Sequence, residues 1–305
     1  MSRLRSLHLL TLAAATQLGG GAAIAGAQTA AFAAGRGITS VPATPGSRVY
    51  GTAVTVGEGR ARSYVVLDEQ TGAPRELGVA LDERALDGLP AAGSGHHGSG
   101  PMTHSYNLAL PSENKTPFRF VELNWNPAGH EPDGVYQGVP HFDFHFYVIS
   151  QAERDAIVPT DPEFETRANN LPAGDYVPPF NVPLGPPGAA PAKVAVPMMG
   201  VHWSDVRSPE LQRLLGKPDA YEPFTATFIH GSWNGQFSFW EPMITRAHIL
   251  EKKTASDPAV RDQVLPISMP AKYATPGYYP SGYRITWDAE AKEYRIALAG
   301  LAWRQ

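Results

Sequence analysis

Short segments in which apolar and polar residues alternate recur along most of this chain, separated by glycine- and proline-rich turns. Because successive side chains of a β-strand point to opposite faces, this alternation predicts half-buried strands. The segments are 50–56, 61–67, 104–110, 118–125, 141–147, 225–230, 236–241, 283–287 and 293–298. Several flank short turns, which predicts hairpins around 57–59, 231–235 and 288–292. The pattern is typical of a mainly β protein, α+β at most, built as an antiparallel β-sandwich or barrel-like domain with a few short helices.

Other segments predict helices and loops. Helices are expected within 82–86, 150–156, 161–169 and 208–215, with Ser150 and Asp161 as N-caps, since their side chains accept hydrogen bonds from free amides of the first turn. The proline- and glycine-rich segment 171–191 predicts a loop or a lid, and 91–100 predicts an exposed loop that carries His96 and His97. Residues 28–47 are expected to form a flexible lead-in, and 48–305 a single β-rich domain.

The first 27 residues have the pattern of a cleaved signal peptide. Arg3 and Arg5 precede the apolar run 9–15, and Ala25-Gly26-Ala27 fits the small-residue cleavage site. Thr11 and several glycines interrupt the run, which argues against a membrane-spanning helix of ~20 apolar residues. We therefore expect an exported protein, periplasmic or extracellular, with no stable membrane insertion after cleavage.

Charge and cysteine content narrow the classes of function. Cleavage after Ala27 removes two arginines and leaves 23 basic and 29 acidic side chains, a net charge of −6 with histidine neutral. Nucleic-acid binding depends on basic surfaces, so we expect no nucleic-acid partner. The chain has no cysteine, which excludes disulfides and thiolate metal sites. Any metal ligands must therefore come from histidine and carboxylate side chains.

The segment from Pro140 to Tyr147 carries the strongest candidate chemistry. On a strand, His141, Asp143 and His145 share one face while three phenylalanines share the other. Polar residues backed by an aromatic wall predict a buried polar site. Imidazole and carboxylate ligands suit Zn, Fe, Mn, Ni or Cu better than Ca or Mg. His202 and Glu241, each beside aromatic residues and close to glycine or proline, are the further predicted ligands.

Strand geometry leaves several arrangements open. His141 and His145 lie about 13 Å apart on a regular strand at ~3.3 Å per residue. Either the strand is bulged, or one adjacent pair binds the ion, or both histidines bind while Asp143 orients a neighbour. Alternatively, Asp143 bridges the two histidines in a purely structural hydrogen-bonded network. His130 and His230, placed in turns, rank below these residues.

Known metal sites match this pattern only in part. The His-x-Asp…His triad of iron/2-oxoglutarate oxygenases would use His141, Asp143 and His202, with Arg213 as the cosubstrate arginine. That motif is weak, and export separates the protein from cytosolic 2-oxoglutarate. The His-x-His motifs of cupins and α-carbonic anhydrases are absent, as are a serine nucleophile elbow and a phosphate loop.

Read together, several blocks resemble one known family. The blocks are 129–132, 135–136, 140–147, 199–203, 227–231 and 241–245. They are similar to a bacterial family of unknown function represented by a Thermus protein under sigma-E/anti-sigma-E control. The resemblance implies an extracytoplasmic, β-rich, oligomeric protein and no established activity.

Two kinds of function therefore stay open. One is a buried metal site in which the ion, if catalytic, acts as a Lewis acid or activates water beneath the 171–191 lid. The other is a non-enzymatic envelope or stress-response module, with a structural His-Asp-His network and partner surfaces around Trp233 and Trp240. The sequence indicates no catalytic residue and no substrate.

Overall fold

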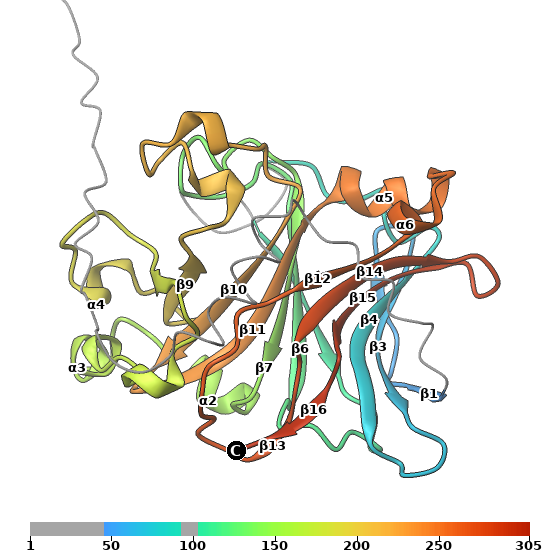
Figure 1. The fold of residues 1–305 in the computed structure, drawn as a ribbon, viewed down its shortest axis with the longest axis horizontal. Coiled ribbons are helices and arrows are strands. Elements are labelled where there is room, and N and C mark those ends of the chain that lie inside the picture. The colour runs from blue at the N-terminus through green and yellow to red at the C-terminus, as the bar shows by residue number, and fades with distance from the viewer. Residues whose placement is uncertain (1–45, 93–102) are drawn as a thin grey trace, which may run out of the picture.

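The computed structural model describes residues 46–92 and 103–305. Two antiparallel sheets pack against each other, and a small two-stranded sheet lies at one edge (Figure 1). The predicted signal peptide and the His96-His97 pair lie outside the described residues, as does all of the lead-in except 46–47. Within the described residues neither sheet closes on itself, so the sandwich form of the predicted fold is the one observed.

The first sheet has the strand order β1-β3-β4-β15-β14-β12, with β2 paired to β3. Its strands are β1 (Ser47–Tyr50), β2 (Val54–Val56), β3 (Gly59–Leu67), β4 (Pro74–Asp82), β12 (Asp262–Pro266), β14 (Gly282–Asp288) and β15 (Glu293–Ala299). The small sheet pairs β13 (Gly277–Tyr279) with β16 (Ala302–Arg304).

The second sheet has the order β5-β6-β7-β11-β10-β9-β8. Its strands are β5 (His104–Ala109), β6 (Phe120–Asn126), β7 (His141–Tyr147), β8 (Asn181–Pro183), β9 (Val201–Asp205), β10 (Ala226–Trp233) and β11 (Gln236–Thr245). The strand with the His-Asp-His pattern, β7, thus lies inside the sheet between β6 and β11, where both of its faces are covered.

Short helices connect and flank the strands. They are α2 (Gln151–Asp155), α3 (Phe164–Asn169), α4 (Pro191–Val194), α5 (Arg246–Thr254) and α6 (Pro258–Arg261), with 3₁₀ turns η1 (Gly174–Tyr176), η2 (Pro209–Leu211) and η3 (Pro218–Ala220). Helix α2 begins as predicted, because Ser150 and Glu153 form a reciprocal capping box. Helix α5 follows β11 directly and contacts strands of both sheets. None of the helices among the described residues has the length and apolar character needed to cross a bilayer.

The main core lies between the inner faces of the two sheets. Phe142, Phe144 and Phe146 point into it from β7 and are fully buried together with Val79 and Ile296 of the first sheet. Burying a phenylalanine contributes roughly 1.5–3 kcal/mol. This aromatic row fixes the register of β7, because a shift by one residue would move the polar row into the core.

The hairpin of β10 and β11 has a shorter turn than predicted. Trp233 pairs with Gln236, which leaves Asn234 and Gly235 as a two-residue loop with φ values of 48° and 84°. Positive φ at both positions is the signature of a type I′ turn, which asparagine and glycine adopt with least strain. The strands therefore extend to Trp233 and Gln236, and Gly231 lies within β10.

Four predicted elements were wrong in detail. The helix expected at 82–86 is a series of turns that follows β4 and buries Ala85 and Leu86 in the core. Helix α3 begins at Phe164, because Asp161 accepts the amide of Glu163 in a turn before it. Within 171–191 the structure has η1 and strand β8, which pairs with β9 at the sheet edge. Only the 3₁₀ turn η2 forms in 208–215.

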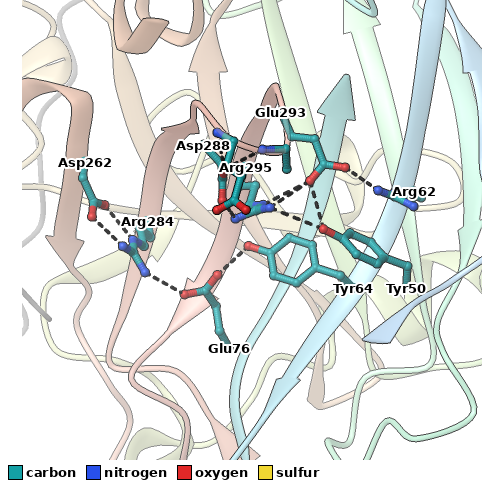
Figure 2. Close-up of polar contacts among 11 residues, drawn as sticks. Tyr50, Arg62, Tyr64, Glu76, Asp262, Arg284, Asp288, Glu293 and Arg295 are labelled. Carbon is teal, nitrogen blue, oxygen red and sulfur yellow. Dashed lines mark hydrogen bonds and ion pairs between the residues drawn. The ribbon is translucent and has the colours of Figure 1, made fainter. Parts of the chain in front are cut away.

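The outer face of the first sheet carries a charged and aromatic network, shown in Figure 2. The Tyr64 hydroxyl donates to Glu76, which also pairs with Arg284 at 3.2 Å. On the neighbouring strands, Glu293 accepts from Arg295 at 3.0 Å and from Arg62. Acids and bases alternate in this network, so its buried charges compensate one another.

Candidate metal centre

The outer face of the second sheet holds a buried polar row. His141, Asp143 and His145 lie on this face of β7, opposite Asn126, Asn124 and Glu122 of β6. The face is covered by an apolar layer in which Val135, Tyr136, Leu211 and Phe224 pack on Ile229 and Met243. The sequence prediction of a polar face backed by an aromatic wall is therefore confirmed at the level of the strand.

One group of candidate ligands combines His130, His141 and Asp143, whose ligand atoms lie within 4.8 Å of one another. The Nε2 atoms of His141 and His130 lie 3.2 and 3.5 Å from the two carboxylate oxygens of Asp143. We call this set the first group. His130 comes from the loop between β6 and β7, and the other two residues come from β7 itself.

Backbone carbonyls orient both imidazole rings of the first group. Nδ1 of His141 lies 2.7 Å from the carbonyl of Val139, and Nδ1 of His130 lies 2.7 Å from the carbonyl of Glu131. A carbonyl only accepts, so Nδ1 carries the hydrogen and Nε2 is directed at Asp143. Asn126 donates to the same carboxylate at 2.6 Å. Fixing the tautomer through the remote nitrogen is what metal-binding histidines usually require.

Charge coupling in the first group is strong. Burial disfavours the ionised form of Asp143, but the charge of His141 and the hydrogen bonds of both histidines outweigh it and hold the pKa of that carboxyl well below its usual range. Burial also opposes the charging of His130, yet the hydrogen bond to Asp143 raises its pKa overall. The negative charge of Asp143 can be compensated either by a proton on His130 or by a metal ion between the imidazoles of His130 and His141.

A second group combines His145, His202 and Glu241, again with ligand atoms within 4.8 Å of one another. Nε2 of His145 lies 3.3 Å from Oε1 of Glu241, and these two residues are only 1% and 2% exposed. Neither ring nitrogen of His145 has a hydrogen-bond partner, nor does Oε2 of Glu241. The ring of Phe239 packs on both His145 and His202, at centroid distances of 4.8 and 5.4 Å.

Burial sets the protonation of the second group. It lowers the pKa of His145 to about 3 and that of His202 to about 4. The charge of Asp143 opposes this shift, and neighbouring histidine charges add to it. Burial and the charge of Asp143 raise the pKa of Glu241 well above its usual range. Without a cation, burial therefore favours the uncharged form of all three side chains. A metal ion would replace the Glu241 proton and find two unprotonated imidazoles.

The structure brings all five sequence-predicted residues to one face but divides them. His141 and Asp143 belong to the first group, and His145, His202 and Glu241 belong to the second. Strand β7 is unbulged along its pairing with β6, so its two histidines serve different groups. The oxygenase-like set fails, because His202 is not with His141, and Arg213 is exposed and stacks on Tyr221 at 3.8 Å.

From the sequence alone, His130 ranked below the other candidate ligands, but the structure places it beside Asp143. Its turn follows β6 and folds back over β7, with the amide of Gly138 bonded to the carbonyl of Ala128. The only sequence signal was a histidine next to Gly129, directly before the metal-ligand strand. This pattern does not predict which strand the loop between β6 and β7 will cover.

His230 lies on the opposite, inner face of the second sheet. Its ring contacts Phe228, Phe237 and Trp240, and neither nitrogen has a hydrogen-bond partner. Burial lowers the pKa of His230 to about 3. It is not part of either group.

The low pKa of His230 predicts acid sensitivity. As pH falls below ~6.5, His230 becomes protonated in the unfolded chain. In the folded chain it stays unprotonated until about pH 3. Stability is therefore lost across that interval. At pH 5 the native protein should have lost about 2 kcal/mol through this residue. Urea unfolding at pH 7 and pH 5 should show a loss smaller by that amount in His230→Phe, and an equal loss in both proteins would contradict the prediction.

Residues 70–125 match the model of the TTHB210-like family. The model is described as hypothetical protein TTHB210, and the match confirms the resemblance to an uncharacterised Thermus protein over these residues. The matched segment ends before His130, so it includes none of the six grouped residues. No curated protein matches the chain. No solved structure matches it either.

Proposed function

We propose that this chain is an exported metal-binding protein that holds transition-metal ions in its two His/carboxylate groups. The observation that supports this most is the second group, where imidazole and carboxylate atoms are buried together without hydrogen-bond partners. Buried polar atoms normally have partners, and a cation would supply them here. Export is supported by the pattern of the first 27 residues.

The donor set indicates the class of metal. Each group offers two histidines and one carboxylate, which suits Zn, Fe, Mn, Ni or Cu. Such a set leaves room for water or another ligand on the ion. A bound ion could therefore act as a Lewis acid or activate that water. Two cavities of the described structure, one near Trp240 and Tyr273 and one near Trp125 and Arg246, are lined by none of the six residues.

A second candidate function is a binding or structural module without a metal. The first group supports it, because its Nδ1 atoms and one carboxylate oxygen of Asp143 already have protein partners. A proton shared between His130 and Asp143 would complete that network. In the second group neither nitrogen of His145 has a hydrogen-bond partner, which is why we favour metal binding.

Elemental mass spectrometry of the mature chain from Gln28, prepared without a histidine tag, tests the proposal. We expect near-stoichiometric transition metal that is lost in a His141→Ala/His145→Ala double variant. A wild-type chain that contains no metal, and is not stabilised by added Zn, Fe, Mn, Ni or Cu, would instead support the structural module.

Asp143→Asn is expected to weaken metal binding at the first group. The amide keeps the shape of the carboxylate but removes the negative charge that faces both histidines. Loss of even an orienting carboxylate weakens metal affinity ~10–100-fold. Isothermal titration of the metal-free protein measures the change, with Asp133→Asn, an exposed residue of the same loop, as the control. Equal affinities in the two variants would remove Asp143 from the site.

A further inference from the structure

The two groups differ in how the protein supports their ligand atoms. In the first group, the remote nitrogens of His130 and His141 bond to backbone carbonyls, and Asn126 bonds to Asp143. These contacts do not depend on an ion. The first group can therefore keep its geometry when its ion leaves.

The second group lacks such support at its two most buried members. Both nitrogens of His145 and one oxygen of Glu241 have no hydrogen-bond partner. In the first group Nε2 of His141 and Oδ1 of Asp143 also lack one, but the remote Nδ1 of each histidine is bonded to a carbonyl, whereas Nδ1 of His145 is not. Leaving buried polar atoms unpaired destabilises the folded state, so an empty second group is costly. Loss of the ion would therefore also lower the stability of the folded protein, and this coupling strengthens binding at the second group.

The two groups also differ in how easily a ligand residue can move to let an ion in or out. The His130 side chain is 33% exposed and lies on a loop. At Gly134 and Gly138 of that loop, a side chain would meet nothing within 4 Å. His202, although partly exposed, belongs to β9, which is paired on both sides by β8 and β10. A loop ligand can move aside to admit or release an ion more easily than one held between two strands.

We infer that the second group holds its ion permanently, whereas the first group exchanges its ion with solution through movement of His130. This rests on the proposed metal binding and assigns the two sites different tasks. The second ion stabilises the outer face of the sheet. The first ion is the one whose occupancy follows the external metal concentration.

Chelation of the Zn-loaded protein tests this inference. During dialysis against EDTA, we expect one equivalent of zinc to leave quickly and one to remain, so that zinc release has two separate phases. His130→Ala should lose only the fast equivalent and keep the thermal stability of the wild type. His202→Gln should lose the slow equivalent and unfold at a lower temperature. Circular dichroism at the start of dialysis confirms that each variant is folded.

The outcomes separate the two proposals. Two equivalents that leave at the same rate would overturn the inference alone, and so would loss of the slow equivalent in His130→Ala. A wild-type chain that takes up no zinc would overturn the proposed function and this inference with it. If His202→Gln does not fold, the wild type and His130→Ala still decide the question, because His130→Ala alone identifies the origin of the fast equivalent.

Discussion

Replacing Arg154 by methionine is expected to lower the free energy of unfolding by about 3–5 kcal/mol. Arg154 of α2 pairs with Glu122 of β6 at 2.6 Å, and the two side chains are 6% and 3% exposed. Removing the guanidinium leaves the Glu122 carboxylate buried without its main counter-charge.

Urea unfolding of matched variants measures this effect. Lys193→Met is the control, since the ion pair of Lys193 with Glu165 has a similar distance of 2.8 Å but side chains 69% and 70% exposed. Exposed pairs contribute only ~0–1 kcal/mol. Adding Glu122→Gln to Arg154→Met should recover much of the loss, because no uncompensated charge then remains. An Arg154 variant as stable as the Lys193 variant would show that the buried pair is unimportant.

A side chain at Gly231 should disrupt the second group by displacing Phe239, which packs against its histidines. Gly231 pairs with both His202 and Phe239, and a Cβ at this position would lie 1.9 Å from the Phe239 ring. Real contacts are never that short, so the ring must move, and it packs on His145 and His202. Overpacking of this kind costs about 1–3 kcal/mol, occasionally more.

We therefore expect Gly231→Ala to unfold at lower urea concentration and to lose the metal of the second group. Gly174→Ala serves as the control, because a Cβ at Gly174 would meet nothing within 4 Å. Thermal unfolding and elemental analysis of both variants provide the comparison. Normal stability together with full metal content in Gly231→Ala would show that Phe239 does not position the two histidines.

Much of the secondary structure followed from local pattern. The predicted hairpins at β2–β3, β10–β11 and β14–β15 are present, because alternation and turn residues act over a few neighbouring positions. Errors occurred where tertiary pairing overrode local composition. Strand β8, in a proline-rich segment, forms only because β9 offers it an edge.

The candidate site was predictable along the strand but not across it. Alternation placed His141, Asp143 and His145 on one face, and the structure confirms that placement. It could not show that the next strand brings Glu241 to His145, or that a loop returns His130 to Asp143. Those contacts join residues far apart in sequence or on different elements, and one strand carries no information about its neighbours.

The sequence by itself determined the β-rich class, the polar and aromatic faces of β7, and the restriction of metal ligands to histidine and carboxylate. Only the tertiary structure decided that there are two ligand groups among the described residues, because it shows that β7 has no bulge and so keeps His141 and His145 too far apart to share one ion. It also decided which atoms remain unpaired, since burial and hydrogen bonding depend on the complete packing of the sheet and its covering loops.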